Sequence, residues 1–437
     1  MRGLLSRASG LDKTAFLLGF FTFLSQVLAL FRDRLLAGRF GTGGDLDIYY
    51  AAFKIPDLIY VTVASFVSVT VLIPILARKL LADQKAAKEF LDQVLTAFLI
   101  IILSIELVIY FLMPYLTHLV APGFGEAAQS QLILLSRVLL LSPILLGLSN
   151  LLGSVTQSLS RFLVFSLTPV LYNLGIILGI LFFYPSFGLL GLTFGVILGA
   201  FLHMAIQMPG LYARSLLPRP VLNVDWRKMR EIIRVSIPRS LTLALGQFVF
   251  LFLNALASLM SAGSIALLNL SFNLQSVPLA IIGVSYSVAA FPELARLREK
   301  GEKRHFYALV SGLAKRILFW SLPVTLFFLL FSLSVVRLVL NSGRFSVGNA
   351  EQVAASLFYF SLSLTAQSLA LLYVRAYYAM GYTRKPLVIS LLGSVLTIIL
   401  AYFGKEASHL SLAYSAGMIF GAAIFYQAFT KDFKSHV

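Results

Sequence analysis

The chain contains no cysteine and very little charge. Of its 437 residues, only 12% are Asp, Glu, Lys or Arg, and only two are tryptophan. Without cysteine, the chain can form neither disulfides nor thiolate metal sites, and a cysteine nucleophile is excluded. Soluble globular proteins carry about 25% charged residues. The sequence therefore lacks about half of the charge that a surface exposed to water normally has.

The residue clusters on which enzymes commonly depend are missing as well. The five histidines stand singly, without the spacing of metal ligands, and no glycine-rich phosphate loop of the Walker type occurs. The connections predicted to face outward are short and contain few acidic residues. An intramembrane transferase would need paired acids and a metal in such a connection. We therefore expect no enzyme activity, no metal and no cofactor.

What the chain has instead is a series of long apolar segments. Hydrophobic residues make up 59% of the sequence, and the mean hydropathy is +0.90. Apolar runs of roughly 20 residues can cross a ~30 Å hydrocarbon core as helices, and they lack the alternation of a β-barrel wall. The first run is too long for a cleavable signal peptide. We predict an all-α polytopic membrane protein of twelve transmembrane helices, at 14–36, 48–77, 93–120, 130–157, 162–184, 187–211, 237–260, 264–292, 314–340, 352–380, 386–403 and 409–430.

Basic residues are distributed unevenly over the connections between these spans. Lys and Arg crowd the N-terminus and the even-numbered connections, above all 212–234 and 296–316, and are scarce in the odd-numbered ones. Because basic residues mark the cytoplasmic face, both termini are predicted to be cytoplasmic. This topology, together with attraction to anionic lipid headgroups, accounts for most of the net charge of +17. Nucleic-acid binding is not needed to explain it.

The two halves of the chain resemble each other. The longest polar interruption, 212–236, separates six predicted spans from six and is expected to be a cytoplasmic amphipathic linker between lobes 1–211 and 237–437. The sequence IPILAR at 73–78 ends the second span, and FPELAR at 291–296 ends the eighth. Two such lobes with a site between them are typical of secondary transporters.

Charges inside the predicted spans mark a candidate cavity. A charge buried in a bilayer costs ~2.5–3.5 kcal/mol even on insertion scales, so such residues indicate a watered space. Arg32 and Asp33 end the first span. Asp47 and Lys54 are seven residues apart, which places them on one face of a helical second span together with Ser65. The alternative is a set of ion pairs that lock the first two spans together.

The second half of the chain offers neutral groups instead. Asn269, Asn273 and Ser276 share one face of the eighth predicted span. The predicted cavity is therefore asymmetric, with charges on the N-terminal half and amides on the C-terminal half. Three further ionisable residues lie within spans: Glu106, Arg137 and Arg375. Each is a candidate either for coupling transport to an ion or for a contact between helices. Arg375 is also a candidate for a position at the membrane interface.

Glycines recur at four-residue intervals in the fifth and sixth spans. Gly175 and Gly179 form one such ladder, and Gly191, Gly195 and Gly199 form the other. Small residues on one helix face allow two backbones to approach closely. We therefore predict that these ladders are sites of helix packing.

Several stretches resemble one known family of membrane proteins. The run SQVLALFRDRLLAGRFGTGGDLDIYYAAFKIPDL at 25–58 resembles the opening signature of the MurJ/MviN family, the lipid II flippases of the MOP exporter superfamily. Similar stretches follow in the same order at 120–124, 161–173, 342–346 and 375–386. The resemblance implies a two-lobed, V-shaped helical bundle that alternates between inward-open and outward-open forms. It also implies a central cavity for the pyrophosphate, sugars and peptide of lipid II.

The resemblance assigns roles to individual residues. Arg32, Asp33, Asp47 and Lys54 match polar cavity positions of that family, with Arg32 and Lys54 as cations that face phosphate. A pyrophosphate that leaves water needs charge-assisted partners, which agrees with the argument from buried charge. The candidate substrate-binding residues are Arg32, Lys54, Asp33, Asp47, Gln26, Asn173, Asn269 and Asn273.

The chain also departs from the family pattern. Gln26 stands where the family usually has an arginine, Tyr60 where it has a basic residue, and Ser65 where it has an acid. Asn273 and Ser276 replace a pair of Arg and Glu. The family usually has fourteen spans, the last two of which help to form a groove for the lipid tail, and only twelve are predicted here.

The sequence therefore favours a flippase that moves lipid II from the inner to the outer leaflet of a bacterial cytoplasmic membrane by alternating access. A flippase for another polyprenyl-linked saccharide is the second hypothesis, and a drug/cation antiporter of the same superfamily is the third. A scaffold without transport activity is disfavoured, because it would not need Lys54 inside a span. We expect a monomer whose partners are lipid II or a related lipid and the membrane lipids, with coupling to an ion or to the membrane potential left open.

Overall fold

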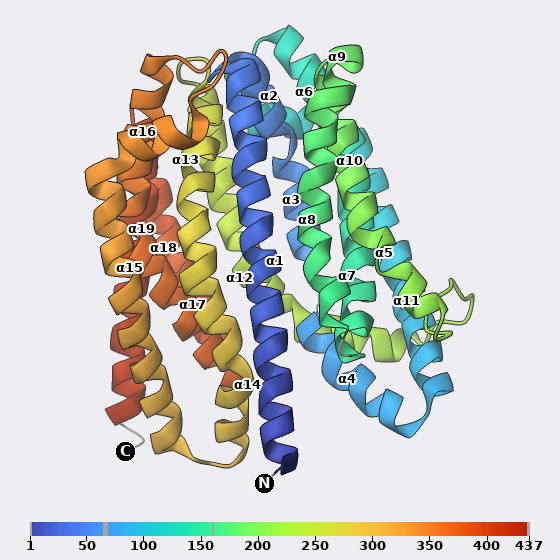
Figure 1. The fold of residues 1–437 in the computed structure, drawn as a ribbon. Helices are drawn as coiled ribbons and strands as arrows, with labels where there is room; N and C mark the ends of the chain where they lie inside the picture. The colour runs from blue at the N-terminus through green and yellow to red at the C-terminus, as the bar shows by residue number, and fades with distance from the viewer. Residues whose placement is uncertain (1, 64–68, 160, 435–437) are drawn as a thin grey trace. The chain divides into compact units, whose positions relative to one another are not determined.

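The structure is built from helices (Figure 1). It is a computed structural model that describes residues 2–63, 69–159 and 161–434. Within those residues no strand occurs. The prediction of an all-α protein is therefore confirmed.

The chain divides into two compact units. Unit 1 comprises Met1–Leu35, Ala52–Leu119 and Gly125–Ser240, and unit 2 comprises Leu36–Ala51, Val120–Phe124 and Leu241–Val437. The main boundary after Ser240 lies close to the predicted end of the linker. Two short stretches from the first half of the sequence nevertheless belong to unit 2.

The bounds of the elements follow the order of the chain. Those that lie in unit 1 or begin there are α1 (Arg2–Phe40), α3 (Lys54–Val63), α4 (Val69–Ala82), α5 (Gln84–Val120), α6 (Glu126–Leu139), α7 (Leu141–Ser158), α8 (Phe162–Leu178), the π-helical turn η2 (Gly179–Phe183), α9 (Tyr184–Phe187), α10 (Leu189–Ala205), α11 (Met208–Tyr212) and α12 (Trp226–Ser258). Those of unit 2 are α2 (Gly44–Ala52), α13 (Ser264–Pro278), the π-helical turn η3 (Leu279–Val284), α14 (Ser285–Glu299), α15 (Lys303–Leu340), α16 (Val347–Ser361), α17 (Leu364–Ala379), α18 (Arg384–Tyr402) and α19 (Ala407–Lys434).

Most of the predicted spans correspond to long apolar helices. Among the described residues, nine helices are long and apolar enough to cross a membrane, or ten if α16 and α17, which meet at a 44° bend, count as one span. They cover the ten spans predicted from 93–120 onward. The predicted span 14–36 lies within α1. The span 48–77 is divided among α2, α3 and α4, with 64–68 outside the described residues. These two spans, and hence the number twelve, stay a prediction.

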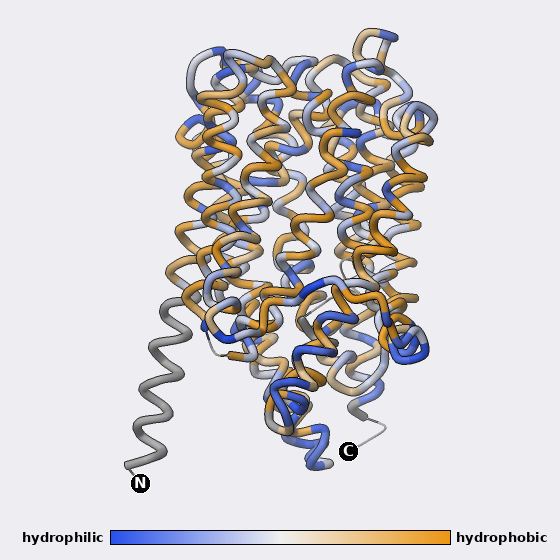
Figure 2. The backbone as a smooth tube through the Cα atoms, turned by 90° about the vertical axis from the view of Figure 1, so that its right-hand side faces the viewer, coloured by the Kyte–Doolittle hydropathy of each residue, from blue (hydrophilic) through white to orange (hydrophobic). Residues whose placement is uncertain are grey.

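The long helices expose apolar side chains that a soluble protein would bury. Only 17% of the most apolar window of α15 is buried, and Phe319, Leu326 and Leu330 on this helix are each more than half exposed. Exposed apolar surface on this scale is expected where lipid surrounds a helix. Figure 2 shows the same pattern along the chain, with hydrophobic residues over most of each long helix and hydrophilic residues gathered towards the ends.

The glycine ladders lie where α8 and its π-helical continuation pack against α10 in unit 1. A side chain at Gly175 would collide with the backbone of Gly199, and one at Gly179 would collide with the backbone of Gly195. Only glycine allows two helices to approach this closely. The predicted packing role of the ladders is therefore confirmed.

The predicted linker 212–236 has two parts. Its second part is helical, because α12 begins at Trp226 and continues into the seventh span. Its first part is held against α5, since the backbone N–H of Arg219 donates to Asp92 Oδ1 at 2.6 Å and that of Val221 donates to Thr96 Oγ1 at 2.9 Å. A hydrogen bond from Lys228 lowers the pKa of Asp225, the residue before α12.

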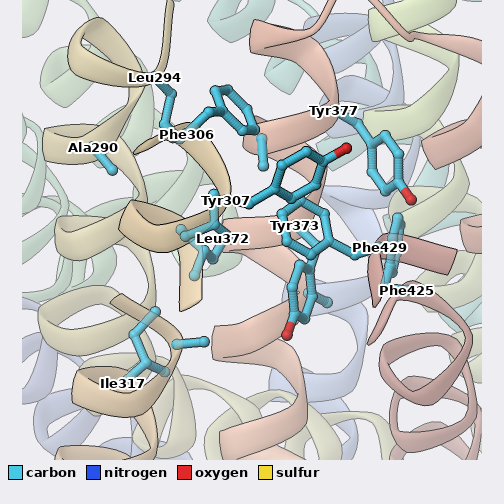
Figure 3. Close-up of a cluster of buried hydrophobic side chains, with 14 of the residues drawn as sticks. Ala290, Leu294, Phe306, Tyr307, Ile317, Leu372, Tyr373, Tyr377, Phe425 and Phe429 are labelled. Atoms are coloured by element: carbon cyan, nitrogen blue, oxygen red, sulfur yellow. The ribbon is translucent and has the colours of Figure 1, made fainter. Parts of the chain in front are cut away.

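An aromatic cluster forms part of the core of unit 2. Figure 3 shows Phe306 and Tyr307 from α15 beside Tyr373 and Tyr377 from α17, with Phe425 and Phe429 of α19 completing the group. The ring centroids of Tyr307 and Phe429 lie 5.0 Å apart, and those of Tyr373 and Phe429 lie 5.3 Å apart. Aromatic pairs at such distances stabilise a core beyond their buried area. This cluster joins the helices at one end of unit 2.

Candidate functional site

Arg32 is the centre of a polar network inside unit 1. Its Nη1 donates to Asn173 Oδ1 at 3.0 Å, while Nε and Nη2 donate to Asp33 Oδ1 at 3.0 and 2.9 Å. Asn173 in turn donates through Nδ2 to Ser25 Oγ at 3.2 Å and to the carbonyl of Pro169 at 3.1 Å. Three predicted site residues therefore come together on α1 and α8, although Asn173 follows Arg32 by 141 residues.

The network satisfies Asp33 but leaves part of Arg32 accessible. The side chain of Asp33 is 3% exposed, whereas that of Arg32 is 19% exposed. Asp33 therefore neutralises and orients the guanidinium. The accessible part of an oriented guanidinium suits an incoming phosphate, because charge-assisted bonds to phosphate oxygens are strong.

Lys54 begins α3 and is 8% exposed. Asp57 lies one turn further along the same helix and attracts Lys54 electrostatically. Asp57 and Arg32 also lie within electrostatic range of Tyr172 on α8. The two predicted cations, Arg32 and Lys54, thus belong to one polar neighbourhood within unit 1. Asp57 belongs to it as well, although the sequence analysis did not include it among the site residues.

Several further polar residues extend this neighbourhood. Asn150 Nδ2 donates to the hydroxyl of Tyr60 at 3.1 Å. Ser149 Oγ lies 2.7 Å from His203 Nδ1, and Gln207 Nε2 donates to Ser149 Oγ at 2.6 Å. The rings of His203 and Tyr172 have centroids 6.4 Å apart in an edge-to-face arrangement. The sequence analysis assigned no site role to these residues, because their hydrogen-bond partners lie far away along the chain.

Asp47 has a different role from the other predicted charges. It lies in unit 2, where Oδ2 accepts from the backbone N–H of Gly263 at 2.6 Å and Oδ1 accepts from that of Ala266 at 2.7 Å. The carboxylate is buried and caps the N-terminus of α13, where a negative charge is favourable. Gly263 has a φ of +94°, a conformation that glycine adopts without strain. This geometry indicates an anchor between α2 and α13.

The helix on which Asp47 and Lys54 were predicted to share a face is interrupted between them. The spacing argument assumed one continuous helix, but α2 ends at Ala52 and α3 begins at Lys54, with a turn at Phe53 between them. A break in the helix changes the direction of every side chain that follows, so a seven-residue spacing carries no information across it. Ser65, predicted on the same face, lies outside the described residues.

The predicted amides of unit 2 bond largely to their own helix. Asn269 Nδ2 donates to the carbonyl of Ile265 at 2.7 Å, and Ser276 Oγ donates to the carbonyl of Asn273 at 2.7 Å. Both asparagines are partly exposed. Gln26, on α1 in unit 1, is also partly exposed. These amides offer neutral hydrogen bonds and no charge.

The three candidates for coupling have different surroundings. Arg137 Nε donates to the carbonyl of Tyr110 at 3.1 Å, and its guanidinium lies 4.5 Å from the centre of the Tyr110 ring, which indicates a contact between α6 and α5. Glu106 is 5% exposed, and its Oε1 has no hydrogen-bond partner among the described residues. Arg375 is partly buried on α17. No group of three or more His, Cys, Asp or Glu within the described part of the chain is arranged to hold a metal.

Replacing Asp47 by alanine is expected to lower the free energy of unfolding by about 1–3 kcal/mol, because two buried backbone N–H groups lose their acceptor. The thermal unfolding midpoint of the purified protein in detergent measures this loss. Asp45→Ala is a matched control, since Asp45 lies in the same helix and is exposed; it should change stability by less than about 0.5 kcal/mol. Equal midpoints for both variants would show that Asp47 is not an anchor.

The long apolar helices define a multi-pass membrane protein, and its fold matches those of solved membrane transporters. A solved structure described as lipid II flippase MurJ in an inward closed conformation matches with a TM-score of 0.82 and 21% identity, over 96% of this chain and 90% of that one. The inward-facing conformation of a multidrug resistance MATE family transporter matches with a TM-score of 0.76 and 17% identity, over 94% of this chain and 95% of that one.

The chain belongs to the family described as lipid II flippase MurJ, whose model matches residues 36–437. A relative from Buchnera aphidicola subsp. Schizaphis graminum, described as a probable lipid II flippase MurJ, is 26% identical over 390 residues, which are 88% of this chain and 76% of the relative. The family resemblance seen in the sequence is therefore confirmed. The family consists of flippases, which confirms a transporter rather than an enzyme.

Proposed function

We propose that this protein translocates lipid II from the inner to the outer leaflet of the bacterial inner membrane by alternating access. The observation that carries the proposal is the network of Arg32, Asp33 and Asn173 beside Lys54 in a chain of the lipid II flippase family. A pyrophosphate that leaves bulk water needs cations that are already oriented and partly desolvated. Arg32 and Lys54 meet that need, with Asp33 and Asp57 as fixed counter-charges.

The second candidate function is translocation of another polyprenyl-linked saccharide. It is favoured by the positions at which the sequence departs from the family pattern. Tyr60 takes the place of a basic residue, and its hydroxyl is bonded to Asn150. Ser276 bonds to the backbone carbonyl of Asn273 within α13, and neither side chain supplies a charge. A substrate with the same pyrophosphate but a different saccharide would use Arg32 and Lys54 equally well.

The experiment that tests the proposal is complementation of a bacterial strain depleted of its own lipid II flippase. Expression of this chain should restore growth and cell shape. The Arg32→Ala/Lys54→Ala double variant, present in the membrane at the same level, should not. Failure of the wild-type chain to rescue growth at a normal membrane level would reject lipid II and favour the second candidate.

We further propose that both termini are cytoplasmic, because Lys and Arg crowd the connections on that side. Reporter fusions at residue 437 and within 212–225 should both read as cytoplasmic. A periplasmic signal at either point would reject the topology. Coupling to an ion or to the membrane potential, and a monomeric state, stay predictions.

A further inference from the structure

A small pocket opens in unit 2 at the aromatic cluster of Figure 3. Its volume is about 90 Å³. The cluster residues Phe306 and Tyr307 form part of its wall, and Met380 and Tyr382 from the connection between α17 and α18 form another part. The pocket therefore has an apolar and aromatic floor, with tyrosine side chains on its wall.

The charged side chains that line this pocket are both basic. Arg298 comes from the last turn of α14 and Lys303 from the first turn of α15. Among the described residues, no acid lines the pocket. Two cations around a small, partly apolar hollow form a site for a compact anion with several oxygens, because charge-assisted bonds to Lys and Arg are strongest with phosphate and carboxylate.

One acid within electrostatic range of the lining residue Tyr307 is already paired. Asp432 on α19 accepts from Lys385 Nζ at 2.9 Å through Oδ1 and at 2.8 Å through Oδ2, and it accepts from the hydroxyl of Tyr377 at 3.1 Å. Lys385 Nζ also lies 5.3 Å from the centre of the Tyr382 ring. The charge of Asp432 is thus compensated locally. Glu302, which stands between the lining residues Gly301 and Lys303, lies 3.3 Å from His305 Nδ1 through its Oε2, and Arg298 and Lys303 are the charged groups that line the pocket.

The position of the pocket along the helices favours a lipid over a free anion. Helix α18 begins at Arg384 and has 19 residues, which is close to the ~20 residues needed to cross the hydrocarbon core. Its start therefore lies at a membrane surface, and Tyr382 precedes it by two residues. Farther along α15, Phe319 and Trp320 are exposed and offer an apolar face for acyl chains.

The composition of the surrounding segments points to one leaflet. The pocket lies among the basic residues of the connection 296–316, at the end of unit 2 that the distribution of Lys and Arg predicts to be cytoplasmic. The cytoplasmic leaflet carries anionic lipids, which basic segments attract.

We propose that this pocket binds the phosphate headgroup of an anionic phospholipid from the cytoplasmic leaflet. Arg298 and Lys303 hold the phosphate oxygens, Phe306 and Met380 face the glycerol, and the acyl chains lie on α15. Tyr382 contacts the headgroup and is itself stacked on Lys385, which bonds to Asp432. The bound lipid therefore stabilises the end of unit 2 that contains the aromatic cluster. This site is separate from the proposed substrate site in unit 1.

The test uses the full-length protein, purified in a neutral detergent and titrated with phosphatidylglycerol or phosphatidylcholine. Native mass spectrometry gives the dissociation constant of the first bound lipid, and thermal unfolding gives the stabilisation. The pocket variant is Arg298→Gln/Lys303→Gln. The matched control is Lys300→Gln/Arg304→Gln, which removes the same charge from exposed residues of the same connection that do not line the pocket. Inorganic phosphate is titrated separately as a competitor.

We expect phosphatidylglycerol to bind more tightly than phosphatidylcholine and to raise the unfolding midpoint. The pocket variant should bind it at least about tenfold more weakly, because two charge-assisted bonds are lost. The control variant should change binding by less than about threefold, since Lys300 and Arg304 do not line the pocket. Equal weakening in both variants would overturn the proposal in favour of diffuse surface charge. Displacement of the lipid by millimolar phosphate would overturn it in favour of a soluble anion.

All four substituted side chains are exposed, so the variants should fold. Their unfolding midpoints without added lipid provide the check. Should the double variant be less stable than wild type, the single variant Lys303→Gln replaces it, and the comparison of the two lipids on the wild-type protein still decides the outcome.

Discussion

Replacement of Lys54 or Arg32 by alanine is expected to abolish or severely reduce lipid II transport, whereas Asn273→Ala should be tolerated or should impair transport only mildly. The reason is the strength of the contact that each residue offers. Loss of a charge-assisted hydrogen bond in a partly dry site costs ~1.5–3 kcal/mol, which is roughly ten- to a hundredfold in affinity. Loss of a neutral amide contact costs nearer ~1 kcal/mol.

The structure adds a control for Arg32. Its removal leaves Asn173 Oδ1 without this donor and the buried carboxylate of Asp33 without this guanidinium, so part of the damage could come from misfolding. Arg32→Lys keeps the positive charge but loses the planar fork that contacts Asp33 and Asn173 together. It should retain more transport than Arg32→Ala if charge is what the substrate needs.

Transport is measured as the appearance of lipid II on the outer leaflet, at matched amounts of each variant in the membrane. If Asn273→Ala is the more damaging change while Lys54→Ala transports normally, the assignment of the pyrophosphate to Arg32 and Lys54 is wrong. The amides of unit 2 would then be the better site for the headgroup.

The second large effect is expected at the glycine ladder. Gly175→Ala should lower the free energy of unfolding by about 1–3 kcal/mol, because overpacking of a tight contact costs this much. The new methyl group would meet backbone atoms of Gly199 and Leu198, which cannot rotate away as a side chain can. The two helices must separate, and their remaining contacts weaken.

The control for this change is Gly312→Ala on α15, where a methyl group would meet no atom within 4 Å among the described residues. This substitution should raise stability slightly, by about 0.5–1 kcal/mol, since alanine favours a helix over glycine. Thermal unfolding of both variants in the same detergent measures the difference. A Gly175→Ala protein as stable as the wild type would show that α8 and α10 do not depend on close backbone contact.

The sequence was a good guide to features that rest on local chemistry. Of the twelve spans predicted from apolar runs, ten correspond to helices that are long and apolar enough to cross a membrane, since length and hydropathy alone decide this property. The glycine ladders predicted packing, because four-residue spacing places glycines on one face of any uninterrupted helix. The charges of the first two spans were predicted either to line a cavity or to form ion pairs between the spans, whereas the ion pair of Arg32 is with Asp33, the next residue on the same helix.

Features that depend on distant parts of the chain were not predictable. The sequence gives no sign that Asp47 accepts from Gly263, because a buried acid looks the same in the sequence whether it binds a substrate or a helix end. The break at Phe53 was also missed, although Pro56, which has no N–H to donate to the carbonyl of Ala52 four residues earlier, is a signal for it. Ser149 and His203 gave no signal because their bond joins α7 to α10, 54 residues apart.

The bond between Asp47 and the start of α13 constrains how the protein is made. The carboxylate of Asp47 and the backbone N–H of Gly263 are 216 residues apart in the sequence. At ~5–20 residues per second, the ribosome therefore needs on the order of 10–40 s after Asp47 to reach Gly263. During that interval Leu36–Ala51, which packs in unit 2, has no completed unit to join. The insertion machinery must therefore accept this nascent segment while the carboxylate of Asp47 lacks its hydrogen bonds to α13. The first half of the protein cannot reach its final state before the second half has been synthesised.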